Sequence, residues 1–192
     1  MSSPESKVFV ITGPSGVGKG TLISRLRARV PGIELSVSAT TRMPRQGETA
    51  GIDYHFLSPE DFERRVEGGE FLEHARYSGN RYGTLRSEVE RRLTEGHPVV
   101  LEIEVQGARQ IRTTMPEAVQ VFIAPPEMDA LRQRLESRGT DEQSAIEARL
   151  RVAEEELAAQ SEFPHQVVND DLDRAAGELE GIVRGKLSES TA

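Results

Sequence analysis

A glycine-rich turn near the N-terminus constrains the fold of this chain more than any other segment. It comprises Gly13, Pro14, Ser15, Gly16, Val17, Gly18, Lys19, Gly20 and Thr21. A run of β-forming residues, 8–12, precedes it, and two leucines at helical spacing, Leu22 and Leu26, follow it. Glycines let such a turn fold so tightly that successive backbone N–H groups point inward, and the helix N-terminus adds positive potential. The pattern Gly-x4-Gly-Lys between strand and helix therefore predicts a loop that binds a nucleoside triphosphate.

Lys19 and the residue after it bear on what the loop can do. The lysine ammonium can reach the β- and γ-phosphates as a point charge, which makes Lys19 a candidate catalytic residue. Loops of this type usually carry Ser or Thr directly after the lysine, where the hydroxyl binds Mg²⁺. This chain has Gly20 at that position, so no hydroxyl ligand can come from there. Thr21 is a candidate to replace it, and the protein ligand of the metal stays open.

The composition is that of a globular protein. The chain has 192 residues, 36% of them hydrophobic, which is enough for one domain with a sizeable core. No apolar run approaches the ~20 residues of a membrane span, and the first residues lack a secretory signal.

With 24 basic and 32 acidic residues the net charge is −8, which argues against general nucleic-acid binding. Cysteine is absent, as suits a reducing compartment. We therefore expect a cytoplasmic protein without nucleic-acid or membrane partners.

Short apolar runs alternate with amphipathic stretches along most of the chain. The runs cover residues 8–11, 99–101 with its continuation through Glu102-Ile103-Glu104-Val105, 119–123 and 167–168. Near-continuous runs of this kind are typical of strands that are buried on both faces of a parallel sheet. Apolar residues at helical spacing follow the glycine turn, recur within 141–160 and recur again from residue 172 onward. The alternation predicts a doubly wound α/β fold.

Two segments interrupt this alternation. Residues 35–84 contain many glycines among short polar and aromatic pieces, with one helix expected near 59–67. Residues 134–151 are rich in arginine and predict a mobile pair of helix ends. We expect the first segment to form an inserted lobe and the second a lid, within one domain spanning residues 1–192. The core of that domain would comprise residues 7–34, 85–133 and 152–187.

Several motifs, in chain order, make the sequence similar to guanylate kinases. The first is Ser36-Val37-Ser38-Ala39-Thr40-Thr41-Arg42-Met43-Pro44-Arg45-Gln46-Gly47-Glu48, which resembles the monophosphate-binding signature of that family. Further matches are Gly51–Phe56, Gly69–Glu73, Ser78–Thr84, Phe122–Pro126, Arg134–Thr140 and Val168–Leu172. The resemblance implies a P-loop NTPase three-layer fold with a parallel sheet core, an inserted GMP-binding lobe and a helical lid. It also implies transfer of the γ-phosphoryl group from ATP to GMP, with Mg²⁺ as cofactor.

The resemblance assigns the acceptor phosphate to the inserted lobe. Arg42 and Arg45 match the positions that bind the phosphate of GMP, and Pro44 stiffens the link between them. Two guanidinium groups so placed can hold one dianion through bidentate hydrogen bonds. Tyr54 and Tyr82 match positions that each offer a phenolic O–H to the same phosphate.

The guanine base has its own matching positions. Glu73 matches the residue that reads guanine, because a carboxylate accepts from both N1–H and the 2-amino group, a donor pair that adenine lacks. Ser38 and Thr84 match hydroxyls that contact the base. Glu104 completes the GMP-binding set at a position where the family most often has Asp. Glu102, in the same acidic pair, joins Thr21 as an indirect candidate for holding the metal.

Three arginines match the lid of the family, namely Arg134, Arg138 and Arg149. In the family such residues would close over ATP and neutralise charge on the transferring phosphoryl group. The expected catalytic residues are Lys19, Arg42, Arg134, Arg138 and Arg149. Asn169 matches a segment that borders the adenine of ATP, so we expect it to join the nine residues of the glycine-rich turn in binding ATP.

Two alternatives stay open from the sequence. A non-catalytic guanylate-kinase-like binding module would keep the fold but lose the loop lysine, and Lys19 counts against it. A related P-loop kinase could use a ribose bisphosphate as acceptor, and Glu73 with Ser38 and Thr84 favours guanine instead. We expect ATP, GMP and dGMP as substrates and a monomer or small homo-oligomer.

Overall fold

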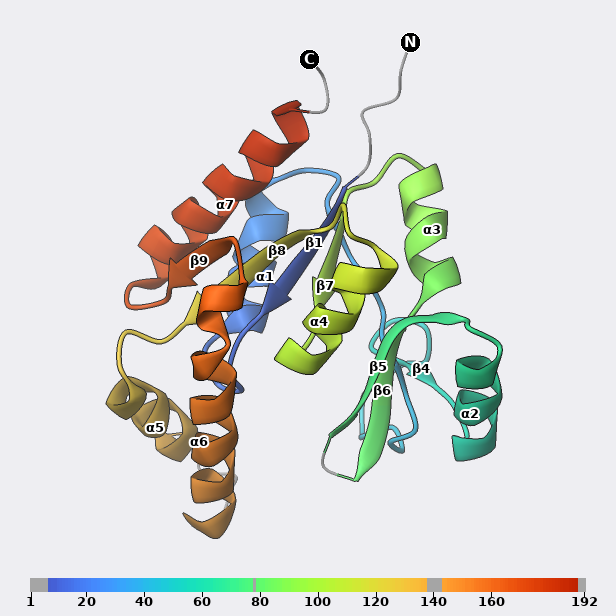
Figure 1. Cartoon of the computed structure of the whole chain (residues 1–192), viewed down its shortest axis with the longest axis horizontal. Helices are drawn as coiled ribbons and strands as arrows, with labels where there is room; N and C mark the ends of the chain where they lie inside the picture. Colours follow the sequence, from blue (N-terminus) through green and yellow to red (C-terminus); the bar gives the residue numbers. More distant parts are fainter. Residues whose placement is uncertain (1–6, 78, 138–142, 190–192) are drawn as a thin grey trace.

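A computed structural model describes residues 7–77, 79–137 and 143–189, and its strands form two sheets (Figure 1). The larger sheet has the strand order β2-β7-β1-β8-β9, and all neighbouring strands are parallel. Its strands are β1 (Val8–Thr12), β2 (Glu34–Leu35), β7 (Val99–Glu102), β8 (Val119–Ala124) and β9 (His165–Val168). The predicted α/β fold with a parallel core is confirmed.

Helices cover both faces of the larger sheet, which gives the core three layers (Figure 1). They are α1 (Lys19–Arg29) and α7 (Leu172–Glu189) on one face, and α3 (Arg86–Thr94) and α4 (Val105–Thr114) on the other. Successive residues of a strand point to opposite faces. In β1, Phe9 and Ile11 pack toward α1 and α7, whereas Val8 and Val10 pack toward α3 and α4. Both faces are thus apolar, which explains the continuous hydrophobic runs.

A second, four-stranded sheet with the order β4-β3-β6-β5 forms a small lobe, residues 37–85. Its elements are β3 (Ala39–Thr40), β4 (His55–Phe56), α2 (Pro59–Glu67), β5 (Phe71–Tyr77) and β6 (Asn80–Leu85). Helix α2 occupies the predicted range. It begins after Ser58, whose side chain accepts a hydrogen bond from the Asp61 N–H at 3.0 Å and caps the first turn. Phe62 of α2 is buried and stacks on Phe71, with ring centroids 4.5 Å apart.

The remaining helices follow β8. They are α5 (Met128–Ser137), α6 (Gln143–Ala158) and a 3₁₀ turn, η1 (Gln160–Glu162). Leu131 and Leu135 of α5 join Ile146 and Leu150 of α6 in the cluster beneath α1 and α7. The predicted pair of helix ends corresponds to the end of α5 and the start of α6, and Arg138 lies outside the described residues. In the part of the chain that the structure describes, no helix is long and apolar enough to cross a membrane.

Two boundaries differ from the expectation. The apolar run 99–105 is not one strand: β7 ends at Glu102, and Val105 opens α4. Val105, Ala108 and Ile111 are buried at helical spacing, and a run this short cannot show which period applies. Leu35, expected in the lobe, pairs with Val100 in the larger sheet.

Candidate functional site

A cavity of about 540 Å³ lies between the carboxyl ends of the parallel strands and the small lobe. Ligands of open α/β sheets bind at this end of the strands, because the loops that follow the strands converge there. Six predicted residues of the glycine-rich loop line it: Ser15, Gly16, Gly18, Lys19, Gly20 and Thr21. Six predicted residues from elsewhere also line it: Ser38, Tyr54, Glu73, Tyr82, Glu102 and Glu104. The fold thus joins two groups of residues that are far apart in sequence.

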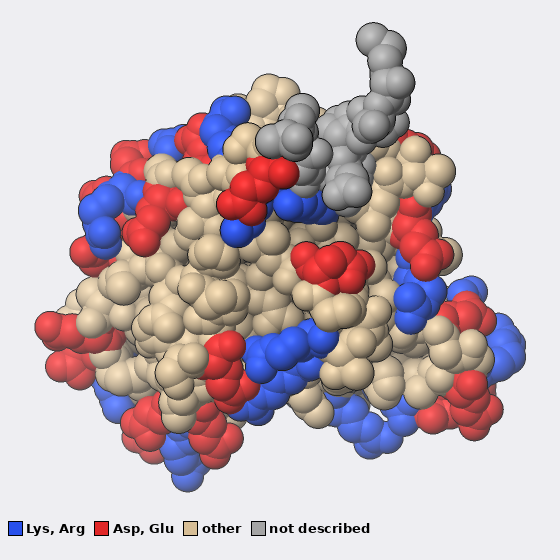
Figure 2. Space-filling model, turned by 45° about the horizontal axis from the view of Figure 1, so that its top comes forward, with Lys and Arg blue, Asp and Glu red and all other residues tan. Residues whose placement is uncertain are grey.

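The outer surface adds no large region of one charge on the face that Figure 2 presents. Acidic and basic side chains are interspersed there around uncharged surface (Figure 2). The groups near the cavity that favour a phosphate are the ammonium of Lys19 and the N-terminus of α1.

The loop backbone forms the cradle that the sequence predicts. Gly18 is the N-cap of α1 and has φ 100°, a left-handed conformation that favours glycine. A Cβ at this position would lie 2.6 Å from Asn169 Nδ2, so only glycine fits. No side chain caps α1, and its first turn holds no acidic residue, which leaves its N–H groups to an anion.

Lys19 lies over the loop. Its Nζ donates hydrogen bonds to the carbonyl oxygens of Gly13, at 2.6 Å, and Pro14, at 3.1 Å. Burial lowers the pKa of Lys19, while the carboxylates of Glu102 and Glu104 counteract that effect. The ammonium is therefore held among carboxylates at the position where a triphosphate would enter.

Glu156 of α6 is a further member of this charge cluster that the sequence analysis missed. Burial, and then the charge of Glu104, raise its pKa to about 7, whereas Lys19 and a hydrogen bond from the Ser15 backbone N–H act in the opposite direction. The residue lies far from the loop in sequence and belongs to none of the motifs. Only the packing of α6 beside the loop brings it there.

Oxygen donors near Gly20 fit a magnesium ion. Both carboxylate oxygens of Glu102 lie 3.7 Å from the point where a Cβ on Gly20 would stand, and Thr21 and Glu104 line the same end of the cavity. Mg²⁺ binds through one or two carboxylates together with water and substrate phosphates. Among the described residues there is no group of three or more His, Cys, Asp or Glu side chains that could hold a metal ion.

The two predicted phosphate arginines behave differently. Arg42 forms a fork with Glu48, at 2.8 and 3.0 Å, and its guanidinium lies 5.2 Å from the centre of the Tyr54 ring. This hydrogen-bonded pairing raises the pKa of Arg42. Arg45 is exposed, and its backbone N–H donates to Glu48 at 2.7 Å. Glu48 stands in the motif that carries the family resemblance, yet a partner for Arg42 was not foreseen.

Glu73 is enclosed at the lobe end of the cavity. The residue is 5% exposed, and the Thr84 hydroxyl donates to its Oε1 at 2.7 Å. Burial raises the pKa of Glu73 to about 7, against the effect of the hydrogen bonds from Thr84. Gly107 of α4 leaves the room it needs, since a Cβ there would lie 2.5 Å from Glu73 Oε2. The pair predicted to read guanine is thus in direct contact.

Arg134 and Asn169 lie behind the loop. Arg134 donates to the carbonyl oxygens of Val17, at 3.1 Å, and Asn169, at 2.8 Å. The Asn169 side-chain amide also donates to Val17 O, at 2.8 Å. Both residues support the backbone of the loop, and neither lines the cavity. Arg149 lies on α6, outside the lining among the described residues.

Comparisons with known proteins identify the family. The family model described as Guanylate kinase matches residues 5–186. The chain belongs to the guanylate kinase family. Among the family's curated members, the Guanylate kinase of Synechococcus sp. (strain CC9311) is 56% identical over 171 residues, 89% of this chain and 90% of that protein. The Guanylate kinase of Gloeobacter violaceus is 50% identical over 189 residues, 98% of this chain and 92% of that protein.

A solved member of the guanylate kinase family shares the fold. The crystal structure of the guanylate kinase from Anaplasma phagocytophilum matches with a TM-score of 0.75 and 32% identity, covering 97% of this chain and 88% of that one. As a guanylate kinase, the chain is an ATP-dependent phosphotransferase that acts on GMP. The activity expected from the motifs is confirmed, and the comparisons give no support to the binding module or the ribose-bisphosphate kinase.

Proposed function

We propose that the cavity between the loop and the small lobe is where ATP and GMP meet, and that the residues predicted from the sequence hold them. The observation that carries this proposal is the shared lining: Lys19 of α1 in the core and Glu73 of β5 in the lobe line the same cavity. A kinase that transfers a phosphoryl group directly needs both substrates in one water-excluding space, because proximity and orientation supply much of the catalysis.

The loop, residues 13–21, binds the triphosphate through its N–H groups and Lys19. Lys19 then leaves the carbonyl oxygens of Gly13 and Pro14 for the phosphates, where its charge is neutralised more fully. Mg²⁺ supplies charge neutralisation on the phosphates when it is bound. Glu102 and Thr21 would hold it through water.

The lobe binds the acceptor. Arg42, Arg45, Tyr54 and Tyr82 hold the GMP phosphate, while Glu73, Ser38, Thr84 and Glu104 hold the base. One phosphate oxygen of GMP attacks the γ-phosphorus of ATP in line, the bond to the β,γ-bridging oxygen breaks, and ADP leaves. Arg134, Arg138 and Arg149 neutralise charge on the transferring group when the lid closes, and Asn169 borders the adenine.

This assignment divides the chain as the sequence suggested, into a core, a lobe near residues 35–84 and a lid near residues 134–151. The lobe carries the acceptor and the core the donor, so closure of lobe and lid excludes water that would otherwise accept the phosphoryl group. We further propose a cytoplasmic enzyme, monomeric or a small homo-oligomer, that also accepts dGMP and has no nucleic-acid or membrane partner.

A coupled assay of ADP release tests the proposal. The protein is supplied with ATP and Mg²⁺ and with GMP, dGMP, AMP, CMP or UMP, and the Glu73→Gln variant is measured beside it. We expect release with GMP and dGMP and little with the other acceptors. In the variant the preference for GMP over AMP should fall by about two orders of magnitude, because an amide cannot accept from both guanine donors. An unchanged preference would remove Glu73 from the base site.

A further inference from the structure

One edge of the small lobe is fastened to the core by helix α4. The Gln110 amide donates to the carbonyl oxygen of His74 at 2.8 Å and accepts from its N–H at 3.1 Å. The Thr114 hydroxyl donates to the Leu72 carbonyl oxygen at 2.8 Å. These contacts hold β5, the edge strand that carries Glu73, and so fix the base-reading side of the lobe.

The opposite edge, formed by β3 and β4, carries Ser38 and Tyr54 and meets the core differently. The chain enters the lobe directly after Ser36, whose N–H donates to Val100 O of the larger sheet at 2.9 Å. The next residue, Val37, donates its N–H to Glu88 Oε1 at 3.4 Å. Glu88 lies in the first turn of α3, just after the chain leaves the lobe.

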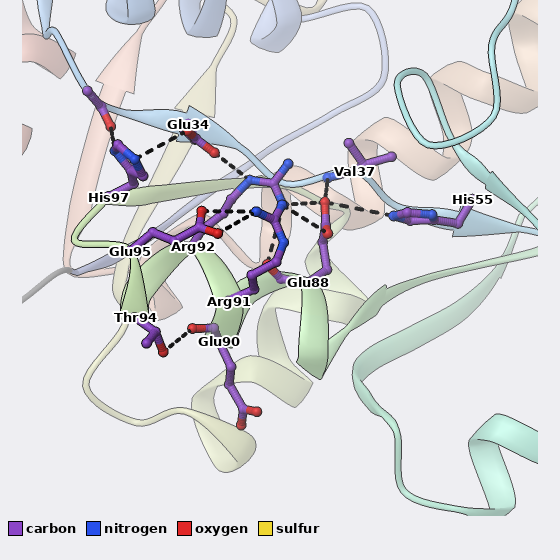
Figure 3. Close-up of polar contacts among 11 residues, drawn as sticks. Glu34, Val37, His55, Glu88, Glu90, Arg91, Arg92, Thr94, Glu95 and His97 are labelled. Atoms are coloured by element: carbon purple, nitrogen blue, oxygen red, sulfur yellow. Dashed lines mark hydrogen bonds and ion pairs between the residues drawn. The ribbon is translucent and has the colours of Figure 1, made fainter.

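Glu88 also faces the second segment of that edge (Figure 3). His55 of β4 places its Nε2 3.8 Å from the same Oε1 atom, and the His55 N–H donates to Ser38 O at 2.9 Å. One carboxylate oxygen of the core therefore touches the backbone next to Ser38 and the side chain next to Tyr54.

A chain of ion pairs connects Glu88 to the larger sheet (Figure 3). Arg92, one turn later in α3, pairs with Glu88 and places its Nε 2.8 Å from Glu34 Oε2 in β2. The Glu88 and Arg92 side chains are each 10% exposed, so solvent screens the pair little. Burial acts to raise the pKa of Glu88, but Arg92, the Val37 N–H and His55 outweigh it, and the pKa is lowered. Glu88 is thus ionised, and its carboxylate contacts both segments of this edge.

We propose that Glu88 is a positioning residue for the acceptor: from α3 it sets where the Val37–Ser38 and Tyr54–His55 segments stand relative to Glu73. The inference rests on the proposed acceptor site. Acceptor binding needs the base and phosphate contacts to be spaced correctly across the lobe. A shift of the β3–β4 edge would displace Ser38 and Tyr54 while the α4-bound edge, which carries Glu73, stays in place. Among the described residues, no hydrogen bond or ion pair joins the ATP loop to Glu88, so we expect ATP binding to be unaffected.

The test is a steady-state comparison of Glu88→Ala with Glu90→Ala. Glu90 lies on the same helix, is 57% exposed and has its ion-pair partner, Arg86, 3.9 Å away, which makes it a matched control. We expect Glu88→Ala to raise KM for GMP about tenfold, with KM for ATP within about twofold and kcat within about threefold of the parent. Glu90→Ala should leave all three unchanged.

Two results would overturn the proposal: an unchanged KM for GMP, or equal rises in KM for GMP and ATP, since a general loss of structure would not choose between substrates. Removing one partner of a buried pair can prevent folding. Glu88→Gln guards against that outcome, because it keeps the size and an oxygen toward Val37. A folded Glu88→Gln protein with unchanged KM for GMP would also reject the role.

Ser38→Ala and Tyr54→Phe separate this inference from the proposed function. If neither variant raises KM for GMP, the placement of the acceptor site is wrong whatever Glu88 does. If both raise it and the Glu88 variants do not, the acceptor site stands and the positioning role falls.

Discussion

At the residue scale, Glu73 is buried, and the base-reading role we propose for it requires a charged carboxylate. To accept from two guanine donors the carboxylate must be ionised, yet burial raises its pKa to about 7. Below that pH the free site is increasingly protonated, so we predict that KM for GMP rises as pH falls below 7, by about tenfold per unit at the limit. KM for ATP, measured in the same series, is the internal reference. A KM for GMP that stays flat between pH 8 and 5.5 would contradict the prediction.

The same residue should make stability depend on pH. The folded pKa of Glu73 lies above its ordinary value of 4.5, so between those values the folded state binds more protons than the unfolded state. Its contribution to the free energy of unfolding therefore falls as pH rises through that window. We predict that Glu73→Gln is more stable than the parent at pH 8, by up to about 3 kcal/mol, and gains nothing at pH 4. Urea denaturation at both pH values measures this.

Lys19 gives a second prediction at this scale. Its ammonium is buried over the loop, and its charge is needed only when phosphates are present. Lys19→Met should lower kcat by about three orders of magnitude. The circular dichroism spectrum and the temperature of thermal unfolding should stay close to those of the parent, because the substitution replaces a buried charged group with an apolar one. Lys186→Met, which alters an exposed ion pair with Glu189, is the control. Near-normal turnover in Lys19→Met would reject its assigned role.

At the scale of single elements, helix α4 has to contain a glycine. An added Cβ at Gly107 would stand 2.5 Å from Glu73 Oε2 and 3.1 Å from its carboxyl carbon. Gly107→Ala should thus displace the base reader and raise KM for GMP at least about tenfold, with little change for ATP. Gly181→Ala on α7 meets nothing within 4 Å, so it should only gain about 0.5–1 kcal/mol of helix stability. An equal KM for GMP in the two variants would show that a Cβ at position 107 can be accommodated beside Glu73.

At the scale of the whole molecule, the donor loop and the acceptor lobe belong to different sheets on either side of one cavity. In-line transfer requires them to approach, so we predict that small-angle X-ray scattering records a smaller radius of gyration with a bisubstrate ligand joining adenosine and guanosine. The starting value for a chain of this length should be about 16 Å. GMP alone and ATP alone are the comparison states, and a radius that none of the three ligands alters would argue for a preformed closed site.

The sequence by itself determined the parallel core, the phosphate loop and the family. Continuous apolar runs, a glycine turn and collinear motifs are local signals, and strands buried on both faces produce them directly. It also singled out Glu73 with Thr84, which the structure shows in contact, and Tyr54 with Tyr82, which line the cavity, because each belongs to a motif. The strand expected over residues 99–105 was wrong at its end, where α4 begins, since a short apolar run does not reveal its period.

Only the tertiary structure decided which distant side chains share a site. Glu156 comes to Lys19 through the packing of α6, and Arg134 turns to backbone carbonyl oxygens behind the loop. Glu88 reaches Val37 and His55 because α3 starts where the lobe ends. Such contacts depend on how elements pack across long sequence separations, and no local pattern of residues encodes them. Burial depends on the same packing, which is why the raised pKa of Glu73 could be found only in the folded molecule.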